Sequence, residues 1–198
     1  MYPFEIHLTT RTLTSAELAT FVAACGELQA KPLLIELARG ACPTQPMLGK
    51  VVHQPDLAAA LAVAAADSAY LRQCGLLTTR IKVETDARHP QLATPTAGPG
   101  FAPYFEWHGK VAYLHQAELR VLCEQHGAHL SVNALRGESA TRFVTLREFG
   151  PAAEFERRVA ALSTALHQRW PLLKQEAECC LYDSNQALDA GWLTQEHS

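Results

Sequence analysis

The four-residue stretch FEIH at Phe4–His7 returns as FEWH at Phe105–His108, and this recurrence constrains the fold more than any other feature of the sequence. The same spacing also superimposes two AEL tripeptides. At a slightly shorter spacing, KVE at Lys82–Glu84 resembles KQE at Lys174–Glu176. Because these matches occur in the same order in both halves, they favour an internal duplication over chance.

Hydrophobic periodicity divides both halves into the same series of elements. In the first half it predicts strands at FEIHLTT, KPLLIEL, Met47–His53 and TTRIKVE, and helices at Ser15–Leu28, with Ser15 or Thr14 as N-cap, and Asp56–Cys74. In the second half it predicts strands at YFEWHGKVAYL, AHLSVNAL, TRFVTLREF and LLKQEAECCLY, and helices at Gln116–Gln125 and Pro151–Arg169. The order β-α-β-β-α-β is that of ferredoxin-like units. We therefore predict an α+β fold, a tandem ferredoxin-like duplication (βαββαβ)2 whose two antiparallel sheets face a central cavity.

The domain boundaries follow from this pattern. We predict a first repeat over residues 1–85, a linker rich in Pro and Gly over 86–103, a second repeat over 104–183 and a C-terminal tail over 184–198. The tail is too short for another unit, and we expect Trp192 to dock it on the body of the protein.

Composition limits the partners. A net charge of -3 gives no global attraction to nucleic acid or to anionic lipid. The N-terminus has no signal-peptide pattern, and the most apolar segment is interrupted by Asp67 and Ser68. The six cysteines form no CxxC pair, as expected for reduced thiols. We therefore predict a cytoplasmic monomer or homodimer that binds a small-molecule ligand and neither nucleic acid nor membrane.

Strand alternation predicts where the ionisable residues lie. With Phe4 and Ile6 facing the helices, Glu5 and His7 occupy the other face of the sheet. The same reasoning places further polar residues on the two open faces: Glu36, Lys82, Glu84, Glu106, His108, His129, Ser131, Asn133, Lys174, Glu176 and Glu178. Both Glu-x-His strands could then line one cavity between the sheets.

One hypothesis for this cluster is a divalent-metal site. Imidazole and carboxylate ligands suit Zn, Fe, Mn or Ni, and the predicted ligands are His7, His108, Glu5 and Glu106. In a metal-dependent small-molecule enzyme, the catalytic residues would be His7, His108, His129, Glu84 and Glu176. A pseudo-twofold site of this kind resembles that of the vicinal oxygen chelate enzymes in its logic, although those enzymes use βαβββ units.

Three alternatives stay open beside the metal site. The cavity could bind a small molecule without catalysis, or the same residues could form cross-strand ion pairs on a solvated face. The third alternative rests on HLT at His7–Thr9 and HLS at His129–Ser131, which are similar to the paired motifs of 2H phosphoesterases. In that family the motifs occupy equivalent strands, whereas here one lies on a first strand and the other on a second strand.

Several basic residues could recognise an anionic group of a substrate. Arg39 with Gly40 mirrors Arg136 with Gly137, and arginine suits carboxylate or phosphate. The predicted substrate-binding residues are Arg39, Arg136, Arg142, Lys82 and Lys174.

The stretches FEIH, KPLLIEL, YFEWH, HGAHLS, RFVTLR and LYDSNQALDAGWL together resemble a widespread family of uncharacterised soluble proteins with two ferredoxin-like repeats. The resemblance covers nearly the whole chain and implies a stable two-repeat unit, without implying an activity. At QPMLGK, Gln45 and Met47 match the family's pattern, but Leu48 and Gly49 follow where Ser or Thr is usual.

Overall fold

The computed structural model describes residues 1–89, 101–137 and 139–192. Within these ranges the first half contains β1 (Tyr2–Thr10), α1 (Ser15–Glu27), β2 (Lys31–Leu37), β3 (Thr44–Gln54), α2 (Leu57–Gln73) and β4 (Thr78–Asp86). The second half contains β5 (Tyr104–Ala112), α3 (Gln116–Gln125), β6 (Ala128–Asn133), η2 (Ala134–Arg136), β7 (Thr141–Glu148), α4 (Ala152–His167), β8 (Leu172–Asp183) and η3 (Gln186–Asp189). Most of the predicted linker, residues 90–100, and the end of the predicted tail, residues 193–198, lie outside the described residues.

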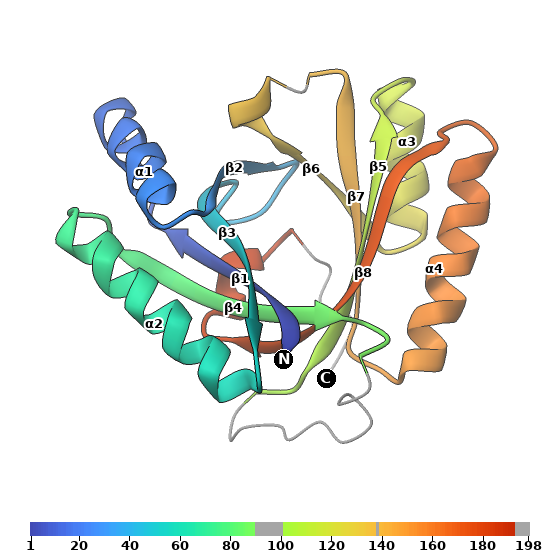
Figure 1. Cartoon of the computed structure of the whole chain (residues 1–198). Coiled ribbons are helices and arrows are strands. Elements are labelled where there is room, and N and C mark those ends of the chain that lie inside the picture. Colours follow the sequence, from blue (N-terminus) through green and yellow to red (C-terminus); the bar gives the residue numbers. More distant parts are fainter. Residues whose placement is uncertain (90–100, 138, 193–198) are drawn as a thin grey trace.

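The strands of the described residues close into one antiparallel barrel in the order β1-β3-β2-β6-β7-β5-β8-β4 (Figure 1). The prediction of two ferredoxin-like units with separate sheets facing one another is therefore wrong. The outer strands that two separate sheets would leave unpaired are paired, β2 with β6 and β4 with β8. An unpaired edge leaves backbone N–H and C=O groups without partners, and closure of the barrel satisfies them. Periodicity within one strand carries no information about such pairing between the halves.

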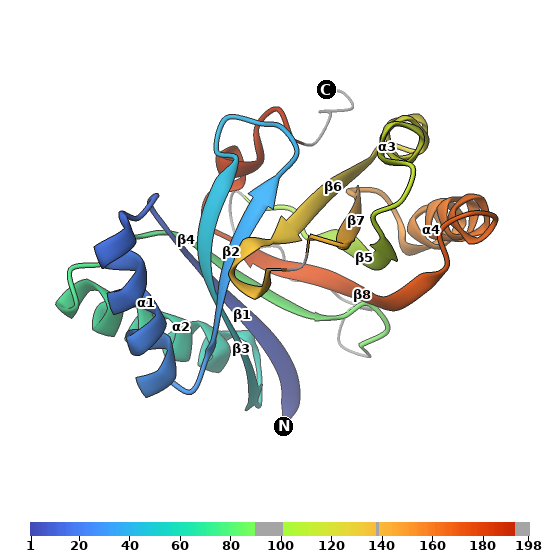
Figure 2. The ribbon, with the colours of Figure 1, turned by 90° about the horizontal axis from the view of Figure 1, so that it is seen from above.

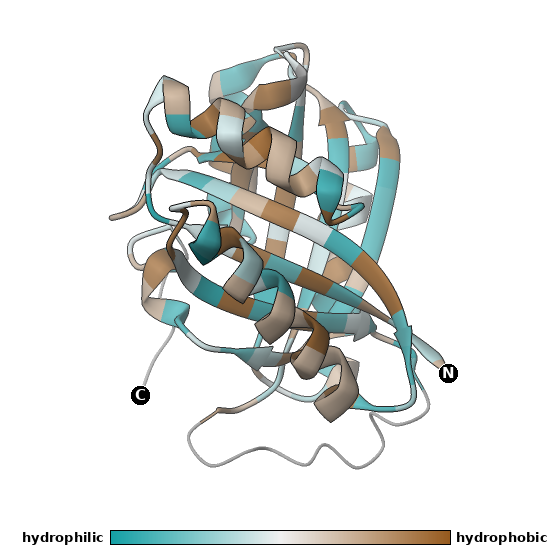
Figure 3. Ribbon diagram, turned by 60° about the vertical axis from the view of Figure 1, so that its left-hand side comes forward, coloured by the Kyte–Doolittle hydropathy of each residue, from teal (hydrophilic) through white to brown (hydrophobic). Residues whose placement is uncertain are grey.

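The helices cover the outside of the barrel. Figure 2 shows α1 and α2 on one side and α3 and α4 on the opposite side, each pair packed on strands of its own half. The apolar residues of β1, including Phe4, Ile6 and Leu8, pack against the first pair of helices. Trp107 and Val111 of β5 belong to a second core beneath the other pair. The hydrophobic cores therefore lie outside the barrel, and the alternation along the strands (Figure 3) turns polar residues inward.

The helix boundaries confirm the predicted capping signals. Thr14 caps α1, and its hydroxyl accepts from the backbone N–H of Glu17, whose carboxylate accepts from the N–H of Thr14 in return. Asp56 caps α2, and its carboxylate accepts from the backbone N–H of Ala59 at 2.9 Å. Gly75 follows that helix with a φ of +80°, a conformation that costs glycine little.

Strand β2 differs from the prediction in the face that it turns inward. Leu33, Ile35 and Leu37 line the interior of the barrel, so Glu36 lies on the opposite face. The prediction for Glu36 assumed that every apolar strand face lies under a helix. Here the apolar face of β2 forms part of the interior wall instead, and this gives the barrel an interior that is charged on one side and apolar on the other.

None of the helices within the described ranges is long and apolar enough to cross a membrane.

Candidate functional site

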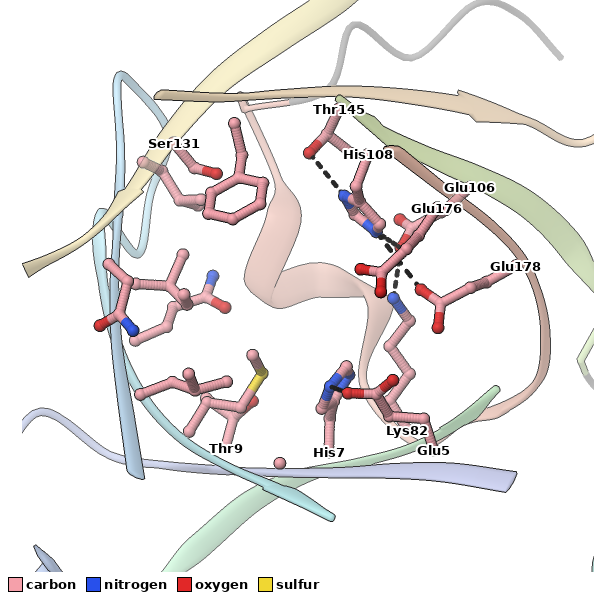
Figure 4. A pocket seen from close by; sticks show the side chains of 18 of the residues that line it. Glu5, His7, Thr9, Lys82, Glu106, His108, Ser131, Thr145, Glu176 and Glu178 are labelled. Atoms are coloured by element: carbon pink, nitrogen blue, oxygen red, sulfur yellow. Dashed lines mark hydrogen bonds and ion pairs between the residues drawn. The ribbon is translucent and has the colours of Figure 1, made fainter. Parts of the chain in front are cut away.

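The interior of the barrel contains a cavity of about 320 Å³. Its charged wall comes from β1, β4, β5, β7 and β8, and its apolar wall from β2 and β3, with Phe143 of β7 beside them. Figure 4 shows His7, His108 and Glu178 pointing into the open space between these walls. A volume of this size lies at the lower end of the range of small-molecule pockets.

Two Glu-His-Glu clusters occupy the charged wall, one from each half. In the first cluster, His7 Nε2 lies 3.1 Å from Glu5 and its Nδ1 lies 3.0 Å from Glu84. In the second, His108 Nε2 lies 3.5 Å from Glu106 and 3.7 Å from Glu178, while Nδ1 is hydrogen-bonded to the Thr145 hydroxyl at 3.0 Å. We call these the first triad and the second triad.

The strand register shows which positions correspond. Glu5 pairs with Glu84 across β1 and β4, and Glu106 pairs with Glu178 across β5 and β8. Glu178 is therefore the counterpart of Glu84, and the prediction that Glu176 plays this role is wrong by one inward-facing position. Glu176 is exposed and forms an ion pair with Lys174 at 2.6 Å at the edge of the cavity.

Lys82 connects the two triads. Its ammonium group lies 2.7 Å from Glu84 and also donates to Glu106. Arg147 of β7 binds Glu106 as well, through Nε at 2.7 Å. Both Glu106 and Lys82 are buried, so the hypothesis of ion pairs on a solvated face does not fit this cluster. Charged groups in such an interior interact more strongly than on a surface, because water screens them less.

A second part of the network closes one end of the cavity. Arg80 binds Asp183 at 2.8 Å, and Asp189 of η3 accepts from both Arg80 and Arg147, at 2.9 and 2.8 Å. Trp192 is buried beside these groups, as we expected for a residue that docks the C-terminal segment. The segment that contains η3 therefore forms part of the cavity wall.

The charges of the first triad are fixed at neutral pH. Burial alone would lower the pKa of His7, but Glu5 and Glu84 raise it to about 10. The hydrogen bond with His7 in turn lowers the pKa of Glu5 to about 2. Burial opposes ionisation of Glu84, yet Lys82 and His7 hold its pKa below the usual value. The contacts of Glu84 with these two residues are close ion pairs without good hydrogen-bond geometry.

The second triad is different because Glu178 has no fixed cation beside it. Within the part of the chain that the structure describes, Glu178 forms an ion pair with His108 and with no lysine or arginine. Burial, followed by the charges of Glu84 and Glu5, raises the pKa of Glu178 to about 8. Burial also opposes protonation of His108, but Glu106 and Glu178 raise its pKa above the usual value.

The metal hypothesis finds no support in this geometry. No group of three His, Cys, Asp or Glu side chains among the described residues could hold a metal ion. The carboxylate of Glu106 is already bound by Lys82 and Arg147, and the nitrogens of His7 are bound by Glu5 and Glu84. We therefore do not assign His7, His108, Glu5 and Glu106 as metal ligands.

The predicted substrate-binding residues separate into two groups. Lys82 and Lys174 line the cavity, one buried within the triads and the other exposed at its edge. Arg39 lies outside the cavity, where it contacts His129 at 3.1 Å and the carbonyl of Trp192 at 3.3 Å. Arg142 stacks on Tyr113 with 3.8 Å between the guanidinium carbon and the ring centroid. The side chain of Arg136 lies outside the described part of the structure.

His129 is also separate from the triads. It packs near Trp192, and burial together with Arg39 lowers its pKa to about 4, so it is neutral at physiological pH. By register, His129 of β6 lies opposite Thr145 of β7. His7, the histidine of the other motif, lies on β1 opposite Gly49 of β3. The two HxT/S motifs therefore occupy strands that do not correspond, and we do not adopt the phosphoesterase alternative.

Sequence reasoning missed several residues of the charged wall: Arg80, Thr145, Asp183 and Asp189. Two of the strands carried a usable signal. Arg80 is two residues before Lys82, and Thr145 and Arg147 share one strand face, so period-two alternation places them beside residues that were predicted correctly. Asp189 lies beyond the last strand, where no periodicity indicates its position.

Comparisons with known proteins do not assign this chain. No family model matches it, and no curated protein does. A microcompartment protein from Desulfitobacterium hafniense is 16% identical, with a TM-score of 0.30 and coverage of 89% of this chain and 94% of that one. A mutant chlorite dismutase from Candidatus Nitrospira defluvii is 13% identical (TM-score 0.29, coverage 94% and 92%). The regulatory subunit of aspartate kinase from Thermus thermophilus is 13% identical (TM-score 0.34, coverage 83% and 92%). Likeness at these scores carries no argument about fold or function.

Proposed function

We propose that the protein is a small-molecule enzyme that uses general acid-base catalysis inside the barrel, with Glu178 as the proton donor and acceptor. The observation that supports this role is the position of Glu178. It faces the cavity without a fixed cation, and its pKa of about 8 makes it a neutral acid that can ionise near physiological pH. His108, at 3.7 Å, can stabilise the carboxylate once the proton has left.

The other charged residues have supporting roles in this proposal. Lys82 and Arg147 hold Glu106 ionised, and Glu106 orients His108. The first triad keeps a permanent imidazolium, so it contributes charge and does not exchange protons at neutral pH. Environments that push the pKa values of neighbouring groups apart are typical of acid-base sites.

The test uses an unbiased substrate search. The purified protein is incubated with a small-molecule extract of bacterial cells, and the compounds that change are measured by mass spectrometry. We expect compounds that change with the wild type and not with Glu178→Gln, whereas Glu156→Gln, on the exposed face of α4, behaves like the wild type. If no compound changes, or if Glu178→Gln changes the same compounds at the same rate, the enzyme proposal fails.

A non-catalytic binding protein is the alternative. The cavity volume and the apolar wall support binding equally well. A compound that copurifies with the protein at constant stoichiometry, and that the protein leaves chemically unchanged, would favour this alternative.

A further inference from the structure

The charged network inside the barrel contains one carboxyl group too many. Within the described residues, three lysines or arginines and two histidines share this network with six carboxyl groups. The carboxyl groups are those of Glu5, Glu84, Glu106, Glu178, Asp183 and Asp189, and the cations are those of His7, Arg80, Lys82, His108 and Arg147. Even with both histidines protonated, one carboxyl group lacks a cation.

Glu178 is the carboxyl group that lacks a cation. The charged groups on the strands packed against Glu178 show why. Glu5 and His7 of β1 face Glu178. Glu84 of β4 also faces Glu178, as does Asp86, which pairs with Glu178 in the strand register. From β5 it faces Glu106 and His108. Lys82, the fixed cation beside the neighbouring Glu84 and Glu106, is already bound by both of them.

The lysines at the edge of the cavity do not supply the missing charge. Lys174 forms its ion pair with Glu176, and Lys110 lies over the ring of Phe143, with its ammonium 5.6 Å from the centroid. Lys31 is exposed at the start of β2, and its charge helps to lower the pKa of Glu5 rather than pairing with Glu178. The imbalance at Glu178 is therefore local. The group is uncharged while it is protonated, and a cation bound within the cavity would pair with it once it ionises.

The opposite wall indicates what else the ligand carries. Leu33, Ile35 and Met47 face the same cavity from β2 and β3, and this apolar surface cannot pair with a polar group. Glu5 and Glu178 also border a groove on the outer surface, so a charged group can approach this end of the cavity from water.

We propose that the cavity binds a small amphipathic amine, with its ammonium group beside Glu178 and Glu5 and its hydrocarbon body against Leu33, Ile35 and Met47. This inference rests on the proposed function, because it assigns a substrate class to the same site. Binding of the ammonium group ionises Glu178, so one proton leaves the protein as the complex forms.

A matched series of probes tests the proposal: 3-phenylpropylamine, 3-phenylpropan-1-ol and 3-phenylpropionate share one body and differ in charge. Calorimetric titration of the wild type with each probe at pH 6, 7, 8 and 9 measures affinity. Repeating the titration in phosphate and in Tris buffer measures the protons released. We expect the amine to bind more tightly than the other two, with release of about one proton at pH 6 and an affinity that rises about tenfold per pH unit up to about pH 8.

Three results would overturn the proposal. These are tighter binding of the alcohol or the carboxylate than of the amine, binding of the amine without pH dependence, and no detectable binding of the amine. Glu178→Gln is expected to lose the pH dependence and at least tenfold in affinity, with Glu156→Gln as the control. Because the probe series uses the wild type, the result does not depend on the folding of a variant.

The amine titration and the substrate search can fail independently of one another. If the amine binds as expected but no compound in the cell extract changes, the enzyme proposal falls and an amine-binding protein remains. If Glu178 is needed for a reaction but the amine does not bind, the substrate class assigned here is wrong and the enzyme proposal stands.

Discussion

The two triads have the same backbone arrangement and opposite electrostatic behaviour. Each places a histidine between the glutamate two residues before it and a glutamate on the neighbouring strand. In the first triad the histidine and both glutamates are ionised at neutral pH, because their pKa values are shifted away from it. In the second triad, the pKa of Glu178 lies at about 8. The identity of the triad residues therefore does not decide their chemistry.

Two neighbouring positions account for the difference. The residue opposite His7 on β4 is Lys82, whereas the residue opposite His108 on β8 is Glu176. The first triad thus has a lysine within ion-pair distance of Glu84, and the second has an acid at the corresponding position. On the other side, Gly49 lies opposite His7 where Thr145 lies opposite His108, so only the second histidine has a hydroxyl partner there.

The apolar and polar walls follow the same division between the halves. Leu33 and Ile35 of β2 correspond by register to Ser131 and Asn133 of β6. Both halves supply fixed charges, but most of the hydrocarbon surface comes from the first half, and the titratable acid and the neutral hydrogen-bonding groups Ser131 and Asn133 come from the second. A binding cavity with one reactive end arises from this asymmetry.

Substitution of Lys82 should have the largest effect on the free energy of unfolding. Lys82→Met leaves Glu84 and Glu106 buried with one cation fewer, and we expect the free energy of unfolding at pH 7 to fall by about 3–5 kcal/mol. Urea denaturation measures this loss. Lys174→Met is the matched control, because its ion pair is exposed and contributes at most about 1 kcal/mol. Equal effects of the two substitutions would show that Lys82 does not hold the triads together.

Corresponding substitutions in the two triads should change stability in opposite directions. The folded-state pKa of Glu84 is lowered, so its ionised form stabilises the fold above the unfolded pKa, and Glu84→Gln should lose about 2 kcal/mol at pH 8. The folded-state pKa of Glu178 is raised to about 8, so its contribution is present below the unfolded pKa of about 4.5 and is lost as the pH rises to 8. Glu178→Gln should therefore gain up to about 4 kcal/mol at pH 8, since one pKa unit corresponds to about 1.4 kcal/mol and the pKa rises from 4.5 to about 8.

Urea denaturation of both variants at pH 5, 7 and 8 measures these changes. The gain of Glu178→Gln should shrink toward pH 5, where the wild-type carboxyl group is protonated in the folded state and the pH approaches its unfolded pKa of about 4.5. A loss of stability in Glu178→Gln at pH 8 would mean that Glu178 is ionised and well paired, and the distinction between the two triads would disappear.

The sequence was sufficient to predict the elements and the inward faces of β1, β4 and β5, because both depend on local periodicity. Glu5, His7, Glu106 and His108 were placed correctly for this reason. The sequence was not sufficient to predict closure of the barrel, because closure depends on pairing between β2 and β6 and between β4 and β8. The counterpart of Glu84 was misplaced by two residues, because KQE resembles KVE while strand register aligns Glu84 with Glu178. The electrostatic difference between the triads depends on distances between strands, which no single-strand pattern contains.

Titration of His7 gives a smaller stability effect than the glutamate substitutions. His7 has a folded-state pKa of about 10, so its contribution is complete below the unfolded pKa of about 6.5 and is lost as the pH rises through 10. The wild type should lose about 1–2 kcal/mol between pH 8 and pH 10.5 that His7→Gln does not lose. In ¹⁵N-detected NMR spectra, His7 should stay protonated up to pH 9. Deprotonation of His7 near pH 6.5 would contradict the fixed charge of the first triad.

The smallest expected effect concerns the hydroxyl that only the second triad has. Thr145→Val keeps the shape of the side chain and removes the hydrogen bond to His108 Nδ1, which should lower the free energy of unfolding by about 1 kcal/mol. Without that bond the imidazole of His108 is held by Glu106 and Glu178 alone, as His7 is held by its two glutamates. The NMR titration of His108 should therefore change in Thr145→Val and stay the same in Ser131→Ala, which removes a cavity-wall hydroxyl opposite Phe143, two residues along β7 from Thr145. If both variants leave the titration of His108 unchanged, Thr145 does not contribute to the difference between the triads, and the contrast between Lys82 and Glu176 must account for all of it.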